Sequence, residues 1–151
     1  MPQSLTNIII HVVFSTKDRA PWLRDPVLRD EMHRMIGGIS NSMDCQAIIV
    51  GGPEDHIHFL GHQARTVALA DWVKELKRQS SLWAKRRSAK LRDFSWQGGY
   101  GAFSVSQSGK QKAIDYILNQ EEHHRKETFQ EEYRRMLSLH EIGWDEEYVW
   151  G

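Results

Sequence analysis

The chain has 151 residues, 40% of them apolar, and its 20 basic residues balance its 20 acidic ones, so its formal net charge is zero. These values exclude a disordered tail and fit one compact domain over residues 1–151. The single cysteine, Cys45, excludes an internal disulfide framework, and we expect it to be a small buried hydrophobe. The N-terminus lacks a signal-peptide pattern, and no apolar run approaches the roughly 20 residues that span a bilayer. We therefore expect a soluble, cytoplasmic protein.

The first half of the chain predicts two strand-forming regions around a helix, followed by a third strand. Residues 7–15 are β-branched and aromatic, as is typical of a central strand. Asp25 can cap a helix that contains Pro26 in its first turn. Residues 45–50 form a second strand, and a Gly-Gly-Pro turn predicts that His56–His62 returns as its antiparallel neighbour.

The second half predicts a long helix, a glycine-rich strand and two further helices. Thr66 can cap the long helix, and residues 96–106 end in strand-forming residues. Helices are expected over residues 109–124 and 129–140, before an acidic, aromatic tail. The order β-α-β-β-α-β predicts an α+β protein with a ferredoxin-like or RRM-like antiparallel sheet packed by helices, and with additional C-terminal helices.

Basic side chains crowd the predicted long helix and its exit. Charge alone is more typical of a solvated helix face, and the zero net charge is low for a DNA-binding protein. A local basic patch is nevertheless compatible with DNA binding. The residues that we expect to contact DNA are Lys74, Lys77, Arg78, Lys85, Arg86 and Arg87.

The sharpest motif is His56-Ile57-His58 on the predicted third strand. Alternation along a strand places both imidazoles on one face, whereas Ile57 points into the core. Two adjacent imidazoles are suited to one divalent metal ion, although an isolated His-x-His is weak evidence. Asp55 precedes the pair and can orient His56.

The predicted helix over residues 109–124 carries a tyrosine away from its apolar side. At about 100° per residue, Tyr116, Gln120 and His123 share one polar face. A tyrosine that only fills the core should lie on the apolar stripe, as Tyr133 does on the next helix. Tyr100 lies among glycines and could contact a base or fill the sheet, and a helper role for His123 is less expected than simple exposure. The apolar stripe of the tyrosine helix comprises Ala113, Ile114, Ile117 and Leu118.

Four segments together resemble the single-tyrosine HUH transposases, the IS200-like insertion-sequence family and its repeat-associated relatives. They are the VVFSTKDR run at the end of the first strand, Asp-His-Ile-His-Phe-Leu, GGYGAFSVS, and Tyr-x-x-x-Gln on a helix. The resemblance extends over almost the whole chain. It implies a DNA transposase that cleaves and rejoins single-stranded DNA, with hairpin ends, through a 5′-phosphotyrosine formed by Tyr116.

The same resemblance implies that His56, His58 and Gln120 bind Mg²⁺ or Mn²⁺. It also implies a homodimer in which the histidine pair of one subunit can face the tyrosine helix of the other, so that active sites are shared.

Two other functions are alternatives to this one. A histidine-triad hydrolase needs a third histidine two residues after the second, but position 60 is Leu, so that match fails. A non-catalytic or domesticated protein could bind single-stranded nucleic acid on the same fold through Tyr100, Phe103 and the basic helix. Metal-dependent DNA cleavage distinguishes this alternative from the enzyme.

Overall fold

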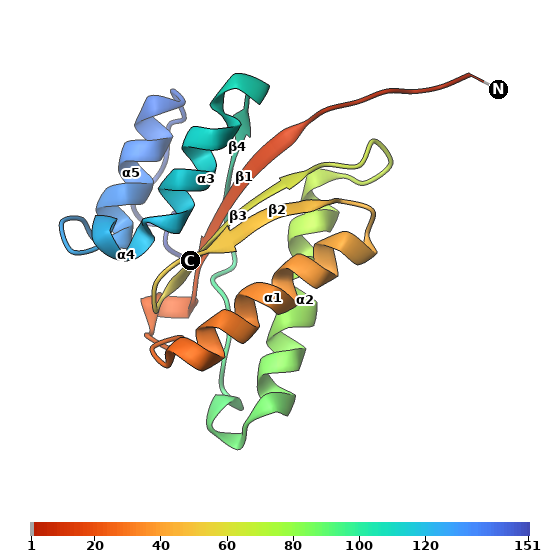
Figure 1. The fold of residues 1–151 in the computed structure, drawn as a ribbon. Coiled ribbons are helices and arrows are strands. Elements are labelled where there is room, and N and C mark those ends of the chain that lie inside the picture. The colour runs from red at the N-terminus through yellow and green to blue at the C-terminus, as the bar shows by residue number, and fades with distance from the viewer. Residues whose placement is uncertain (1) are drawn as a thin grey trace.

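The computed structural model describes residues 2–151 as one four-stranded sheet with helices on both faces (Figure 1). Three short 3-10 turns follow the first strand, the second helix and the last strand: η1 (Lys17–Arg19), η2 (Ala89–Leu91) and η3 (Gln107–Gly109). The strands and α-helices are, in chain order, β1 (Ile9–Ser15), α1 (Pro26–Ser42), β2 (Ala47–Gly51), β3 (His56–His62), α2 (Leu69–Arg87), β4 (Gly101–Val105), α3 (Lys110–Leu118), α4 (Gln120–His123) and α5 (Phe129–Leu139).

The sheet has the strand order β2-β3-β1-β4, and every neighbouring pair is antiparallel. This order, with α1 and α2 as the two connections, confirms the predicted ferredoxin-like fold. The bounds predicted for β3 are those observed, and β1 is a central strand as expected. The predictions for β1 and β2 began two residues too early, because Asn7 and Cys45 precede the first ladder residues.

The two faces of the sheet are covered by different helices (Figure 1). The larger core joins α1 and α2 to the face that carries Phe14, Ile57 and Phe59, and Cys45 is fully buried within it, as expected. The opposite face packs against α3 and α5. Phe103 lies on that covered face and is only 3% exposed, so it cannot stack on a nucleic-acid base as the RRM-like alternative required.

Capping residues account for where the helices begin and end. Asp25 accepts a hydrogen bond from the Val27 amide at 3.0 Å, which confirms it as the cap of α1. Thr66 was wrong as a cap, because α2 begins at Leu69 after Ala68. The predicted helix over residues 109–124 is divided at Asn119, whose φ of −97° and ψ of 22° interrupt α3 before α4. Thr128 forms a capping box that fixes the first turn of α5.

Two glycines allow the C-terminal helices to approach the sheet closely. A Cβ atom at Gly51 would lie 2.7 Å from Cγ2 of Ile117, so the absence of a side chain permits α3 to rest on β2. A Cβ atom at Gly101 would lie 2.6 Å from Cε1 of Tyr133 on α5. Tyr133 is therefore a packing residue, as the sequence predicted, with 4% of its surface exposed.

The acidic tail folds back onto α5. Trp150 packs beside Phe129 and Tyr133, and Arg134 lies over its ring at 5.0 Å. Glu146 accepts hydrogen bonds from Arg134 and from the indole of Trp150. The tail thus has a structural role that its charge pattern did not reveal. Within residues 2–151, no helix combines the length and the apolar composition needed to cross a membrane.

Candidate metal and tyrosine site

The His-x-His pair lies on the face of the sheet covered by the C-terminal helices. His56 and His58 are both fully buried, with ring centroids 5.1 Å apart, whereas Ile57 belongs to the core on the other face. The predicted alternation is therefore confirmed. Burial lowers the pKa of His58 to about 4. For His56, burial acts in the same direction, but the nearby carboxylates of Asp55, which is hydrogen-bonded to Nδ1, and of Glu132 outweigh it and raise the pKa.

The Nδ1 atom of each histidine in the pair lies within hydrogen-bond distance of another side chain. Nδ1 of His56 lies 2.7 Å from Oδ1 of Asp55, the orienting contact that the sequence predicted. Nδ1 of His58 lies 2.8 Å from Nε2 of His11, which was not predicted. His11 stands opposite Leu60 in the β1–β3 ladder, so its ring lies diagonally beside His58. A histidine within the apolar run of residues 7–15 was the only sequence signal for this contact.

Tyr116 on α3 adjoins this pair. Its ring centroid lies 5.7 Å from that of His58, and its hydroxyl donates a hydrogen bond to Oε2 of Glu132. Arg135 donates to the same hydroxyl at 2.9 Å. Burial, reinforced by the Glu132 carboxylate, raises the pKa of Tyr116, while Arg135 acts in the opposite direction. Leu118, expected on the apolar stripe, is 65% exposed, so Ile117 is the residue that anchors α3.

Gln120 lies at the same site but does not contact the phenol oxygen directly. Its Nε2 donates to Oε2 of Glu132 at 3.3 Å, so the carboxylate connects it to Tyr116. Its Oε1 is buried and has no hydrogen-bond partner among the described residues. A buried amide oxygen without a donor is suited to a cation or water.

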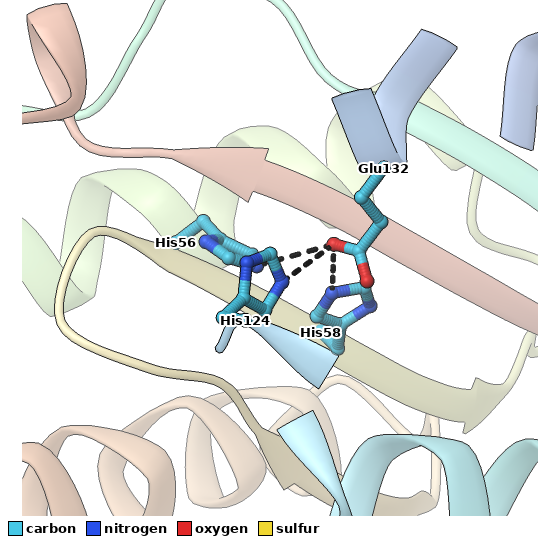
Figure 2. Close-up of side chains that lie close together, drawn as sticks. All are labelled: His56, His58, His124 and Glu132. Carbon is cyan, nitrogen blue, oxygen red and sulfur yellow. Dashed lines mark hydrogen bonds and ion pairs between the residues drawn. The ribbon is translucent and has the colours of Figure 1, made fainter. Parts of the chain in front are cut away.

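Two residues join the site that the sequence pattern did not single out, His124 and Glu132 (Figure 2). His124 follows α4, and Glu132 projects from the first turn of α5 and is fully buried. His123, for which the sequence favoured simple exposure over a helper role, is partly buried, packs against the Tyr116 ring at a centroid distance of 4.6 Å and lies outside the cluster. Four donor atoms, from His56, His58, His124 and Glu132, lie within 4.8 Å of one another, so this cluster could bind a metal ion.

The basic residues of α2 lie in the other layer of the fold, away from the histidines (Figure 1). Nζ of Lys77 donates to the carbonyls of Gln97, Gly98 and Gly99, so this ammonium fixes a loop, and its contact with DNA stays a prediction. Arg78 pairs with Glu75 and Arg87 with Glu31. Lys74, Lys85 and Arg86 are exposed.

Solved structures share this fold. A candidate transposase from Deinococcus radiodurans R1 aligns with a TM-score of 0.60 and 20% identity, over 80% of this chain and 95% of that one. A REP-associated tyrosine transposase bound to a REP hairpin aligns with a TM-score of 0.60 and 13% identity, over 82% of this chain and 72% of that one.

The sequence comparisons give the family. No curated protein matches the sequence. The family described as "Transposase IS200 like" matches residues 4–120, which include the His-x-His pair, Tyr116 and Gln120. The chain belongs to this IS200-like transposase family.

Proposed function

We propose that this transposase cleaves and rejoins single-stranded DNA, with Tyr116 as the nucleophile and with a divalent metal ion, Mg²⁺ or Mn²⁺, held by His56, His58 and Gln120. The observation that best supports the proposal is the position of Tyr116 between the buried histidines and a surface hollow. The hollow has a volume of about 330 Å³ and is lined by Tyr116, His123, Lys126, Glu127 and Arg135. Lys126 and Arg135 offer positive charge to a phosphodiester group beside the phenol, and Arg135 is also paired with Glu127.

The residues present fit a metal ion. Nε2 of His56 and Oε1 of Gln120 are both buried, and neither has a hydrogen-bond partner among residues 2–151. Imidazole nitrogen and amide oxygen are ordinary ligands of divalent ions. A bound ion would offset the negative charge that protects a phosphodiester from attack.

The strand-transfer chemistry follows from the phenol. The oxygen of Tyr116 forms a bond to phosphorus, and the 3′ oxygen leaves and takes up a proton, which gives a 5′-phosphotyrosine and a free 3′-hydroxyl. Because the phosphoester bond energy is retained, a second 3′-hydroxyl can reverse the step and join new ends. The phenol must lose its proton, and Arg135 stabilises the anion through its hydrogen bond to the hydroxyl oxygen.

The DNA partner is proposed from charge and from the related fold. The exposed side chains of Lys74, Lys85 and Arg86 form a positive surface on α2, with Arg78 and Arg87 beside them. The REP-associated transposase of similar fold is bound to a hairpin, which supports single-stranded DNA with hairpin ends as the substrate. The homodimer and the cytoplasmic location implied by the family resemblance belong to the same proposal.

The test is covalent capture. The purified chain, Mn²⁺ and single-stranded DNA from the flanks of its gene should give a protein–DNA band that survives denaturation, and mass spectrometry should place the nucleotide on Tyr116. Tyr116→Phe should abolish the band, while Tyr133→Phe serves as the matched control and should retain it. An adduct on another residue would overturn the mechanism, and DNA binding without any adduct would favour the non-catalytic alternative.

A further inference from the structure

One oxygen of Glu132 faces three imidazole nitrogens (Figure 2). Its Oε1 lies 3.0 Å from Nε2 of His58, 3.1 Å from Nε2 of His124 and 3.3 Å from Nε2 of His56. The carboxylate is fully buried, and His124 is mostly so. These four residues come from β3, the end of α4 and α5, so they converge only in the folded chain.

These nitrogen–oxygen distances are typical of two atoms that bind the same metal ion. Two ligand atoms, each about 2.1 Å from a metal, lie about 3.0 Å apart at a right angle and about 3.4 Å apart at a tetrahedral angle. The three nitrogen–oxygen distances fall within or close to this range. Hydrogen bonds can account for the contacts of His58 and His124 with the carboxylate, but not for that of His56, whose Nε2 lies 3.3 Å from Oε1 without an aligned hydrogen bond.

The contacts of Nδ1 in His56 and His58 also indicate a metal site. A histidine that binds a metal through Nε2 commonly donates its Nδ1–H to a neighbouring acceptor. Asp55 occupies that position for His56, and His11 occupies it for His58. Each Nε2 lone pair then faces the space in front of Glu132.

We propose that His124 and Glu132 are metal ligands together with His56 and His58, and that this site selects a transition ion such as Mn²⁺ over Mg²⁺. The inference deepens the metal site of the proposed function, on which it rests. Three imidazoles and one carboxylate are a donor set suited to first-row transition ions, whereas Mg²⁺ prefers oxygen ligands and retains its waters. Gln120 then contributes less than the carboxylate to metal affinity.

The second oxygen of Glu132 links this ligand set to the nucleophile. Oε2 accepts hydrogen bonds from Tyr116 and, at 3.3 Å, from Gln120. One carboxylate therefore contacts the three histidines on one side and the phenol on the other. This makes α5 part of the active site and not only a packing helix.

The experiment measures metal binding by the full chain without DNA. The metal-free protein is titrated with Mn²⁺, and the free ion is followed by electron paramagnetic resonance. Mutation of a residue that only hydrogen-bonds to a metal ligand already lowers metal affinity by about tenfold or more. We therefore expect His124→Asn and Glu132→Gln, which each alter a ligand itself, to weaken Mn²⁺ binding by about tenfold or more. The matched controls are the adjacent residues, His123→Asn and Glu131→Gln, which should bind as the wild type does.

A second measurement does not depend on any variant folding. X-ray absorption at the manganese edge of the loaded wild-type protein should show three imidazole ligands, and two would overturn the assignment of His124. A hundredfold excess of Mg²⁺ should leave Mn²⁺ bound, and displacement would overturn the selectivity. Unchanged affinity in folded His124→Asn and Glu132→Gln variants that still form the Tyr116 adduct would refute this inference and leave the proposed function standing.

Discussion

Tyr116 and His58 of the same chain lie side by side, with ring centroids 5.7 Å apart. The family resemblance implies that a histidine pair can face the tyrosine of another subunit, but here one chain supplies both groups. We therefore expect a mixture of His58→Ala and Tyr116→Phe proteins to form no covalent DNA adduct, because neither chain carries a complete site. Gel analysis of the mixture, beside each variant alone, measures this. Recovered adduct would show that sites are shared between subunits, and light scattering tests the homodimer itself.

Arg135 is expected to support the attack by Tyr116. Its guanidinium donates to the phenol oxygen at 2.9 Å and is held by an ion pair with Glu127. Removing this charge in Arg135→Gln raises the pKa of Tyr116 further, so less phenolate is present at a given pH. The rate of adduct formation should fall by about tenfold to a hundredfold, and the pH at which the rate is half-maximal should move upward.

The neighbouring arginine provides the control for this prediction. Arg134 pairs with Glu146 in the tail and does not contact Tyr116 in the structure. Arg134→Gln should leave the rate and its pH dependence close to those of the wild type. Equal rates for Arg135→Gln and Arg134→Gln would show that the guanidinium of Arg135 takes no part in the reaction.

The strand that carries the His-x-His pair was predictable from sequence because its signal is local. Alternation along His56–His62 determines which side chains face together, and the Gly-Gly-Pro turn before it sets where the strand begins. His124 and Glu132 could not be found in this way. Their positions depend on the interruption at Asn119 and on the capping box at Thr128, whereas helical periodicity alone placed the adjacent His123, and not His124, on the face of Tyr116.

On α2, the charge pattern of the sequence likewise could not show the surroundings of each basic side chain. Basic residues near one another in sequence have different surroundings once the chain folds. Lys77 is partly buried beneath Tyr100, and burial lowers its pKa to about 8, whereas Lys85 is exposed. The sequence recorded the charge of each residue but not the three carbonyls that hold Lys77.

Variants of α2 should therefore separate into two classes. Lys85→Gln with Arg86→Gln should weaken binding of any single-stranded DNA and reduce the slope of log affinity against log salt by about one to two. Lys77→Met should instead lower the free energy of unfolding by about 1–3 kcal/mol, because three loop carbonyls lose their donor. Fluorescence anisotropy over a salt series and urea unfolding measure the two effects. An unchanged salt slope in the double variant would show that this surface is an ordinary solvated helix face that does not contact DNA.

The contact between Gly51 and Ile117 makes the position of the tyrosine helix testable apart from the chemistry. In Gly51→Ala, the new methyl group would lie 2.7 Å from Cγ2 of Ile117 and 3.0 Å from its carbonyl oxygen, so α3 must move away from β2. Overpacking of this kind lowers the free energy of unfolding by about 1–3 kcal/mol, and adduct formation should fall as Tyr116 is displaced from His58.

Gly38→Ala is the matched control, because Gly38 lies on the exposed side of α1 with nothing within 4 Å of the added atom. Helix propensity predicts that it stabilises the fold by about 0.5–1 kcal/mol and leaves the reaction unchanged. Urea unfolding and the adduct assay measure the stability and the reaction rate of both variants. A Gly51→Ala protein with wild-type stability and rate would show that α3 does not rest on β2 as described.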